Sequence, residues 1–110
     1  MDKMPALSIR QPYAELILRG LKRVEYRTRA TKRRSRIYIY ASSKQGDSCA
    51  FDEIGLRAGD LPVGVLVGTV EIVACTGAPG DYEWHLSAPR RLKRMLKPKN
   101  HPQPSWFYPF

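Results

Sequence analysis

The sequence predicts a small α+β domain, a β-barrel of five or six strands with two short helices packed against it. Its 110 residues leave room for one hydrophobic core,. Several short segments alternate apolar and polar residues with the period of a strand, whereas only two have a helical character. Apolar residues make up 43% of the chain and charged residues 26%, which is typical of a folded protein,. We therefore expect residues 1–110 to form a single domain.

The first half of the chain predicts three strands and one helix. Alternation of side chains predicts strands over residues 6–9, 23–28 and 37–42. A helix is expected from Pro12 to about Arg19, because proline is tolerated in a first helical turn and Gly20 can end a helix in a left-handed conformation. The apolar residues that recur at helical spacing, and that we expect to face the core, are Tyr13, Leu16, Ile17 and Leu21.

The second half predicts a helix and further strands. A short helix is expected over residues 51–56, capped by Asp47 or Ser48. A central strand is expected over residues 63–74, in which Gly64 and Gly68 mark bends or bulges, and another over residues 82–86. Residues 102–110 contain three prolines and four aromatic residues, so they suit an extended segment at a sheet edge. This tail is expected to be buried against the barrel, and docking on a partner protein is the alternative.

The location and the chemistry of the chain are constrained by what it lacks. Its longest apolar run, residues 62–70, is less than half of the ~20 residues that a membrane helix needs. Glu15 and Arg19 interrupt the only candidate for a signal peptide, so a cytoplasmic protein is expected. We expect free thiols and neither a metal site nor a cofactor, because zinc-ligand spacing is absent from Cys49, Cys75, His85 and His101.

The basic residues are concentrated in two segments. The formal net charge is +9. Residues 19–36 contain nine basic residues and one acidic residue, and residues 90–99 contain six basic residues and no acidic one, so the rest of the chain is acidic. A basic surface on an acidic body is typical of a protein that binds a phosphate backbone. The alternative is that these residues only solubilise two exposed loops.

Two motifs in order carry a family resemblance. Residues 8–14 read Ser-Ile-Arg-Gln-Pro-Tyr-Ala, and after the first helix comes the pattern Gly-x-Lys-x-x-Glu-x-Arg, formed by Gly20, Lys22, Glu25 and Arg27. The chain resembles the ASCH family, a branch of the PUA-like superfamily. The resemblance implies a PUA-like barrel with a cleft where the motif's Lys, Glu and Arg gather. It also implies RNA binding or RNA processing: some members bind DNA, one branch cleaves RNA and another is an amidohydrolase acting on acetylated cytidine.

The same residues have a physical interpretation. Glu25 and Arg27 lie two apart on a strand, so they point to one side and can form an ion pair within a cleft. Lys22 can reach the same space, as a phosphate anchor or as a nucleophile or base, and Arg10 should border it. A salt bridge that only holds the barrel together is the alternative. Glu71, in an apolar strand, is expected to pair with a motif arginine.

Two functions remain open at this stage. The first is a module that binds RNA or another single-stranded nucleic acid. Its expected contacts are Arg10, Gln11, Lys22, Arg27, Arg29, Lys32, Arg33, Arg34, Tyr38, Tyr40, Arg90 and Arg91, although the two tyrosines have packing as the alternative. The second is a hydrolase, either a ribonuclease or a nucleoside amidohydrolase, with Lys22, Glu25 and Glu83 as catalytic residues. The amidohydrolase branch has a threonine where Glu25 stands, and His85 is expected to be structural or on the surface.

Overall fold

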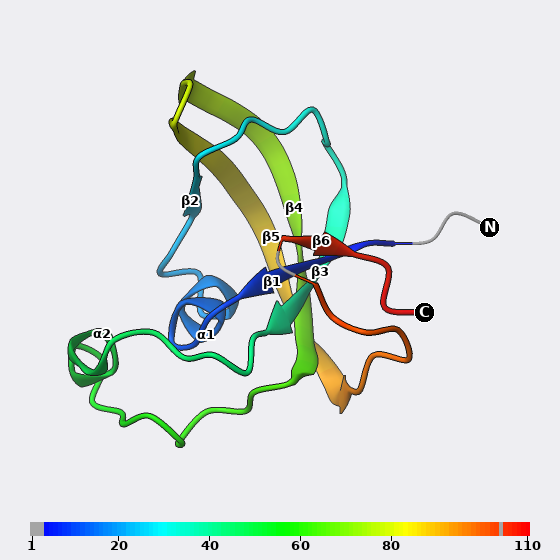
Figure 1. Cartoon of the computed structure of the whole chain (residues 1–110). Helices are drawn as coiled ribbons and strands as arrows, with labels where there is room; N and C mark the ends of the chain where they lie inside the picture. Colours follow the sequence, from blue (N-terminus) through cyan, green and yellow to red (C-terminus); the bar gives the residue numbers. More distant parts are fainter. Residues whose placement is uncertain (1–3, 104) are drawn as a thin grey trace.

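A computed structural model of the chain describes residues 4–103 and 105–110 and shows one curled sheet of six strands with two short helices (Figure 1). The strand order is β2-β5-β4-β3-β1-β6, in which β1 and β3 are parallel and the other neighbours are antiparallel. The elements are β1 (Ala6–Ile9), α1 (Tyr13–Leu18), β2 (Val24–Arg27), β3 (Arg36–Ala41), α2 (Ser48–Asp52), β4 (Val65–Ala78), β5 (Asp81–Leu96) and β6 (Trp106–Phe107). This confirms the α+β class, and the sheet is a half-barrel of the PUA-like kind.

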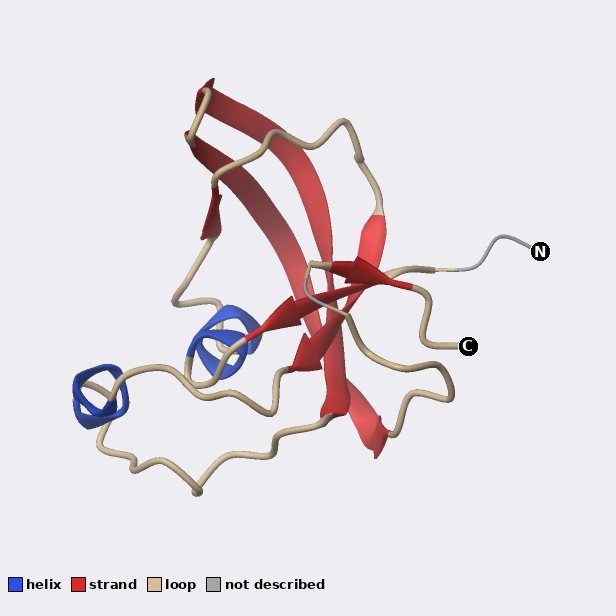
Figure 2. Cartoon of the chain, viewed as in Figure 1, coloured by secondary structure: helices blue, strands red, loops and turns tan. Residues whose placement is uncertain are grey.

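The open side of the half-barrel lies between the two edge strands, β2 and β6, and is bridged by side chains. Arg27 of β2 donates a 2.9 Å hydrogen bond from Nη2 to the carbonyl oxygen of Ser8 in β1. Trp84 of β5 and Trp106 of β6 stack with ring centroids 5.7 Å apart. Figure 2 shows how β4 and β5 curve around behind the crossing pair β1 and β6. The curl thus brings together segments that no backbone ladder joins among the described residues.

Helix α1 begins and ends much as the sequence predicts. Gly20 has φ +77°, and the Leu21 amide donates 2.9 Å to the carbonyl oxygen of Leu16, which closes the helix end,. Ile17 is fully buried against the sheet. The expectation that Leu21 faces the core is wrong, because its side chain is 69% exposed. The left-handed turn at Gly20 takes the chain off the helix axis, so helical spacing does not apply beyond it.

The hairpin of β4 and β5 is longer than the sequence predicts. Strand β4 covers residues 65–78 instead of 63–74, and β5 covers 81–96 instead of 82–86, so most of the second basic segment lies on a strand. Beyond the core, both strands are exposed to solvent. A strand that buries neither face does not need alternating apolar and polar residues, so the sequence pattern does not reveal it. The bulge expected at Gly68 is confirmed by a register shift between Leu66 and Gly68.

The connection between β3 and β4 contains α2, which begins earlier than predicted. The helix covers residues 48–52 instead of 51–56, with Asp47 at the N-cap position. It ends there because Gly55 adopts φ +72° and the Leu56 amide returns to the carbonyl oxygen of Phe51 at 3.0 Å,. In Figure 2 this helix lies farther from the sheet than α1 does.

The C-terminal tail packs against the sheet, as expected, but only part of it is buried, and Tyr108 and Phe110 are exposed. Strand β6 pairs with β1, and Phe107 is 6% exposed. Phe107 packs edge-on against Tyr40 with centroids 5.3 Å apart, and Phe110 packs against Tyr38 at 6.0 Å. The main core contains residues of β1, α1, β3, β4 and β5: Leu7, Ile9, Ile17, Ile37, Ile39, Val67, Val70, Ile72, Trp84 and Leu86.

Within the described part of the chain, no helix has the length and apolarity needed to cross a membrane. Both cysteines are free thiols.

Candidate nucleic-acid interface

The motif places one carboxylate between two cations. Glu25 accepts hydrogen bonds at its Oε2 from Arg27 Nε at 2.9 Å, and Arg27 Nη2 lies 2.7 Å from the same oxygen. Its other oxygen, Oε1, lies 3.6 Å from Lys22 Nζ. The Glu25 side chain is 11% exposed, so the cluster is partly desolvated and the arrangement is well defined,. The expected ion pair between Glu25 and Arg27 is confirmed.

The register of β2 against β5 decides which side chains share the motif's face. Glu25 stands opposite Trp84, whereas Tyr26 stands opposite Glu83. Because neighbouring side chains of a strand point to opposite faces, Glu83 lies on the face of Tyr26 and away from Glu25. His85 lies nearby, with its Nε2 2.8 Å from Thr76 Oγ1. The register therefore places Glu83 and Glu25 on opposite faces, so the structure does not bring these two proposed catalytic carboxylates together.

Lys22 lies next to the Glu25 carboxylate and lines a small cavity. Its Nζ donates to the carbonyl oxygen of Val24 at 2.6 Å and lies 5.1 Å from the centre of the Tyr26 ring. It lines a cavity of about 290 Å³ between the helix end and residues 86–89 of β5. Its side chain is 18% exposed. The Lys22 ammonium therefore lies among Glu25, the Val24 carbonyl oxygen and the rings of Tyr13 and Tyr26.

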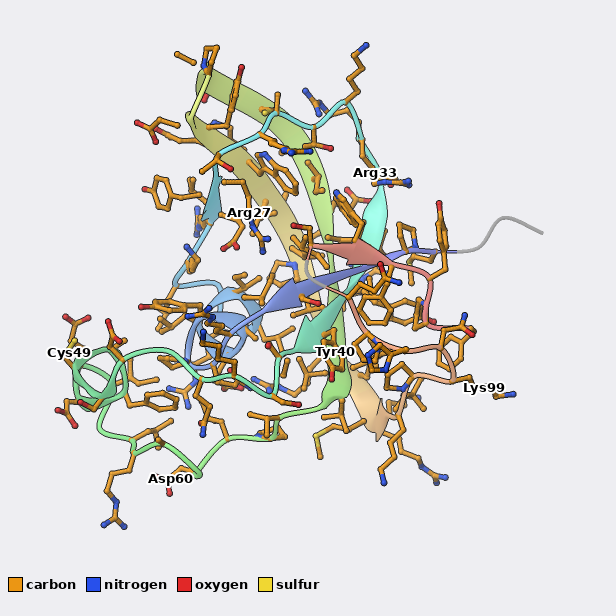
Figure 3. The ribbon with its side chains drawn as sticks, in the orientation of Figure 1. Arg27, Arg33, Tyr40, Cys49, Asp60 and Lys99 are labelled. Carbon is orange, nitrogen blue, oxygen red and sulfur yellow. The ribbon has the colours of Figure 1, made fainter. Side chains whose placement is uncertain are left out.

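Arg27, labelled in Figure 3, extends from β2 and lines three cavities. Their volumes are about 780, 400 and 230 Å³. The smallest is shared with Arg10, Tyr13 and Glu25. Because Glu25 and the Ser8 carbonyl hold the guanidinium from two sides, Arg27 occupies a fixed position where the cavities meet,.

The cavity of about 780 Å³ is a groove that we call the basic cleft. It has three cationic side chains, from Arg10, Arg27 and Lys44, together with His101. Hydroxyl groups come from Tyr40 and from four serines: Ser8, Ser42, Ser43 and Ser105. None of the described residues that line it has a carboxylate side chain. Arg10 lines this cleft and also the smaller cavity with Glu25 and Arg27, which it was expected to border. Ser8 lies in β1, while Lys44, His101 and the other serines come from residues 42–44 and 101–105. These two segments are more than 50 residues apart, so no local pattern predicts that they meet.

The predicted basic loop lies between β2 and β3 and partly folds back on the protein. Arg34 donates from Nη1 to the carbonyl oxygens of Thr31 and Arg33, each at 2.9 Å. The Arg33 guanidinium lies 5.4 Å from the centre of the Trp106 ring (Figure 3). Arg29 lines the cavity of about 400 Å³, and Lys32 is exposed. The loop is therefore next to the open side of the half-barrel.

The second basic segment contains a strong structural ion pair that the sequence did not predict. Arg91 donates from Nη1 and Nη2 to the two carboxylate oxygens of Glu15 at 2.8 and 2.9 Å, and Arg19 donates to Glu15 at 2.7 Å. The hydrogen bond from Arg91 lowers the pKa of Glu15 despite the opposing effect of burial. Arg91 thus joins β5 to α1, while Arg90 is exposed. Residues 15 and 91 are too far apart in the chain for a local pattern to predict this pair.

The structure also places Glu71 and Gln11. Glu71 does not pair with a motif arginine, and its nearest cation is Arg36 at 4.0 Å. The earlier expectation is wrong because Glu71 lies on the half-exposed side of β4 and not in the core. Gln11 is 1% exposed, and its side chain bonds the Glu15 amide and the Pro62 carbonyl oxygen. It therefore anchors the connection between β3 and β4.

The tyrosines of β3 are placed mainly for packing. Tyr40 is 6% exposed and packs on Phe107, while Tyr38 packs on Phe110. Tyr40 also lines the basic cleft. Its ring is too deeply buried to offer a stacking face, which favours the packing role.

Comparison with known proteins agrees with this architecture. The fold and the motif define a PUA-like half-barrel with a basic cleft. The ASCH domain family model matches residues 7–107, and the chain belongs to that family. Human and mouse activating signal cointegrator 1 are each 36% identical over an alignment of length 80, which covers 63% of this chain and 14% of theirs. The chain therefore spans only a small part of those relatives.

Solved ASCH structures share the fold. The ASCH protein from Zymomonas mobilis is 17% identical and has a TM-score of 0.68, with 96% of this chain and 87% of that chain covered. A point mutant of that protein has the same TM-score of 0.68 at 16% identity and covers 97% of this chain and 90% of its own. At this level of identity, the similarity shows the fold alone.

Proposed function

We propose that this domain binds single-stranded nucleic acid, with RNA as the favoured ligand, and that the phosphate backbone lies in the basic cleft. The observation that carries the proposal is the composition of that cleft, where three cations and four serine hydroxyls line about 780 Å³. Phosphate oxygens accept hydrogen bonds from such groups, and Arg27 is already fixed in place by Glu25,. None of the described residues that line the cleft has a carboxylate, and among the described residues Arg27 is the one cation of the cleft that is paired with an acid, Glu25.

The charge of the whole molecule supports the same function. The net charge of +9 attracts a polyanion, and release of its counterions drives binding,. The basic loop lies beside the open side of the half-barrel and extends the positive surface away from the cleft. Membership in the ASCH family adds support, because the family resemblance implies RNA binding or processing.

A hydrolase that uses Lys22, Glu25 and Glu83 has less support from the geometry. Glu83 points away from Glu25, and Lys22 lines a cavity other than the basic cleft. A general acid or base must come within hydrogen-bonding reach of the reacting atoms. We therefore place binding first and treat turnover as an outcome to be measured.

The proposal is tested by removing two cations from the cleft. Arg10→Ala with Lys44→Ala should weaken binding of a labelled 12-nucleotide RNA by about tenfold or more, because two charge-assisted contacts are lost. The matched control is Arg23→Ala with Arg57→Ala, which removes the same charge from exposed positions outside the cleft. Fluorescence anisotropy measures both. Equal losses in the two double variants would contradict the cleft as the binding site and would indicate a non-specific charge effect.

A further inference from the structure

Both tryptophans of the chain meet at the open side of the half-barrel. Trp84 comes from β5 and Trp106 from β6, and their rings are nearly parallel, at 16°. Trp84 is 3% exposed, and its Nε1 donates to the carbonyl oxygen of Arg29 at 2.9 Å. Trp106 is only partly buried. One indole is therefore fixed inside the core, and the other keeps part of its ring surface accessible.

A cavity of about 400 Å³ lies beside this pair, and we call it the tryptophan recess. Its lining includes both indoles, the start of the basic loop at Thr28 and Arg29, and also Arg27 and Ser105. The last two residues line the basic cleft as well. The recess and the cleft therefore adjoin each other, so a ligand with both a phosphate and a flat ring can reach both.

Two arginines lie against the aromatic rings of the recess. The Arg33 guanidinium is 5.4 Å from the centre of the Trp106 ring, and Arg27 is 5.8 Å from the centre of the Trp84 ring. Cations at these distances are attracted to the ring faces. Arg33 comes from the loop between β2 and β3, whose backbone can move more readily than a strand. An incoming ring can therefore replace it without unfolding the sheet.

We propose that the tryptophan recess holds one unpaired nucleobase of the strand whose phosphates lie in the basic cleft. The base stacks on the accessible surface of Trp106, and Arg33 moves from the ring to a neighbouring phosphate. This inference rests on the proposed function and adds the part of the ligand that gives selectivity for a single strand. A paired base is stacked inside its helix and cannot enter a recess of this kind.

A purely structural role for the tryptophans accounts for less of the geometry. Stacking across the open side explains why Trp84 is buried and why its Nε1 is hydrogen-bonded. It does not require a cavity next to Trp106, nor a guanidinium over that ring. The volume of the recess falls within the ~300–1,000 Å³ range of small-ligand sites,. Its described lining residues have two arginines and no carboxylate, which suits an anionic nucleotide.

The test uses the intrinsic fluorescence of the protein. Because the chain has only two tryptophans and both line the recess, their emission reports on this place alone. The unmodified chain is titrated with a uridine hexanucleotide and with an abasic hexamer that has the same number of phosphates. We expect the hexanucleotide to quench the emission and to bind about 5- to 150-fold more tightly than the abasic strand, the range for one stacked base. Uridine monophosphate should bind more weakly than the hexanucleotide, since it offers one phosphate.

Variants locate the effect at Trp106. Trp106→Ala should reduce the affinity for the uridine hexanucleotide to that for the abasic strand, whereas Trp106→Phe should retain most of it. Tyr108→Ala is the matched control, because Tyr108 is an exposed aromatic residue of the same tail outside the recess. If Trp106→Ala does not fold, the unmodified chain and Trp106→Phe still show whether the uridine hexanucleotide binds more tightly than the abasic hexamer, which is the test of the base site.

The outcomes distinguish this inference from the proposed function. Equal affinity for the two hexamers without quenching would overturn the base site and leave the phosphate cleft in place. Failure of both hexamers to bind would overturn both. Binding of uridine monophosphate as tight as that of the hexanucleotide would show a nucleotide pocket and contradict the binding of a strand.

Discussion

Replacing Lys22 by methionine separates support of the fold from contact with a ligand, because methionine keeps an apolar stem and removes the ammonium. Lys22 Nζ donates to the Val24 carbonyl oxygen at 2.6 Å and lies 3.6 Å from Glu25 Oε1. A hydrogen bond from a charged donor contributes about 1.5–3 kcal/mol. A partly exposed ion pair adds at most about 1 kcal/mol. We expect Lys22→Met to lower the free energy of unfolding by about 2–3 kcal/mol.

The effect on RNA binding should be small. Lys22 does not line the basic cleft, so no phosphate contact is lost and the affinity should change by less than about threefold,. Urea unfolding followed by circular dichroism measures the stability, and anisotropy with a 12-nucleotide RNA measures the affinity at a temperature where both proteins are folded. Lys44→Met is the matched control: it lies in the cleft and should weaken binding without changing stability.

Two results would refute this reasoning. A loss of affinity greater than about tenfold, together with a weaker dependence on salt, would show that Lys22 contacts a phosphate. Loss of product formation from RNA or from a modified nucleoside, with unchanged affinity, would show that Lys22 is catalytic. Neither result can come from a folding defect once the stability of the variant is known.

The remaining predictions address the loop, an ion pair and a close packing contact. Arg33→Ala with Arg34→Ala should keep the thermal stability and make the log–log salt slope for single-stranded RNA less negative by up to about 1.4; an unchanged slope would mean that the loop does not contact phosphates. Glu15→Gln should lower the free energy of unfolding by about 1–3 kcal/mol at neutral pH. Because the folded-state pKa of Glu15 is below its ordinary value of 4.5, this difference should shrink as the pH falls through that lowered pKa, and a constant difference would argue against the ion pair,. Gly68→Ala should cost about 1–3 kcal/mol, since its Cβ would lie 2.6 Å from the Arg90 carbonyl oxygen, and a melting temperature equal to that of the unmodified chain would contradict this packing,.

The sequence predicted best those elements whose two faces differ. In β3, Ile37 and Ile39 alternate with tyrosines, and the strand has nearly the predicted bounds. The hairpin of β4 and β5 extends beyond its buried part, and there the side chains face solvent on both sides. Without a buried face there is no period to detect, so the length of this hairpin could not be predicted.

The site shows the same division between local and long-range information. The pairing of Glu25 with Arg27 was predictable, because two residues of one strand determine it. The contact of Arg27 with the Ser8 carbonyl oxygen, and the stacking of Trp84 on Trp106, depend on the curl of the whole sheet. No local pattern encodes that curl, and for this reason the recess and the position of Lys22 behind Glu25 were not foreseen.

The dependence of RNA affinity on salt tests the central claim most directly. If the basic cleft and its surroundings contact about five phosphates of a single strand, the log–log slope should be roughly −3.5, from about −0.7 for each phosphate. Anisotropy titrations of a 12-nucleotide RNA between low and physiological salt give this slope. A slope near −3.5 that becomes less negative in the Arg10→Ala and Lys44→Ala double variant supports phosphate binding in the cleft. An affinity that does not change with salt would contradict it.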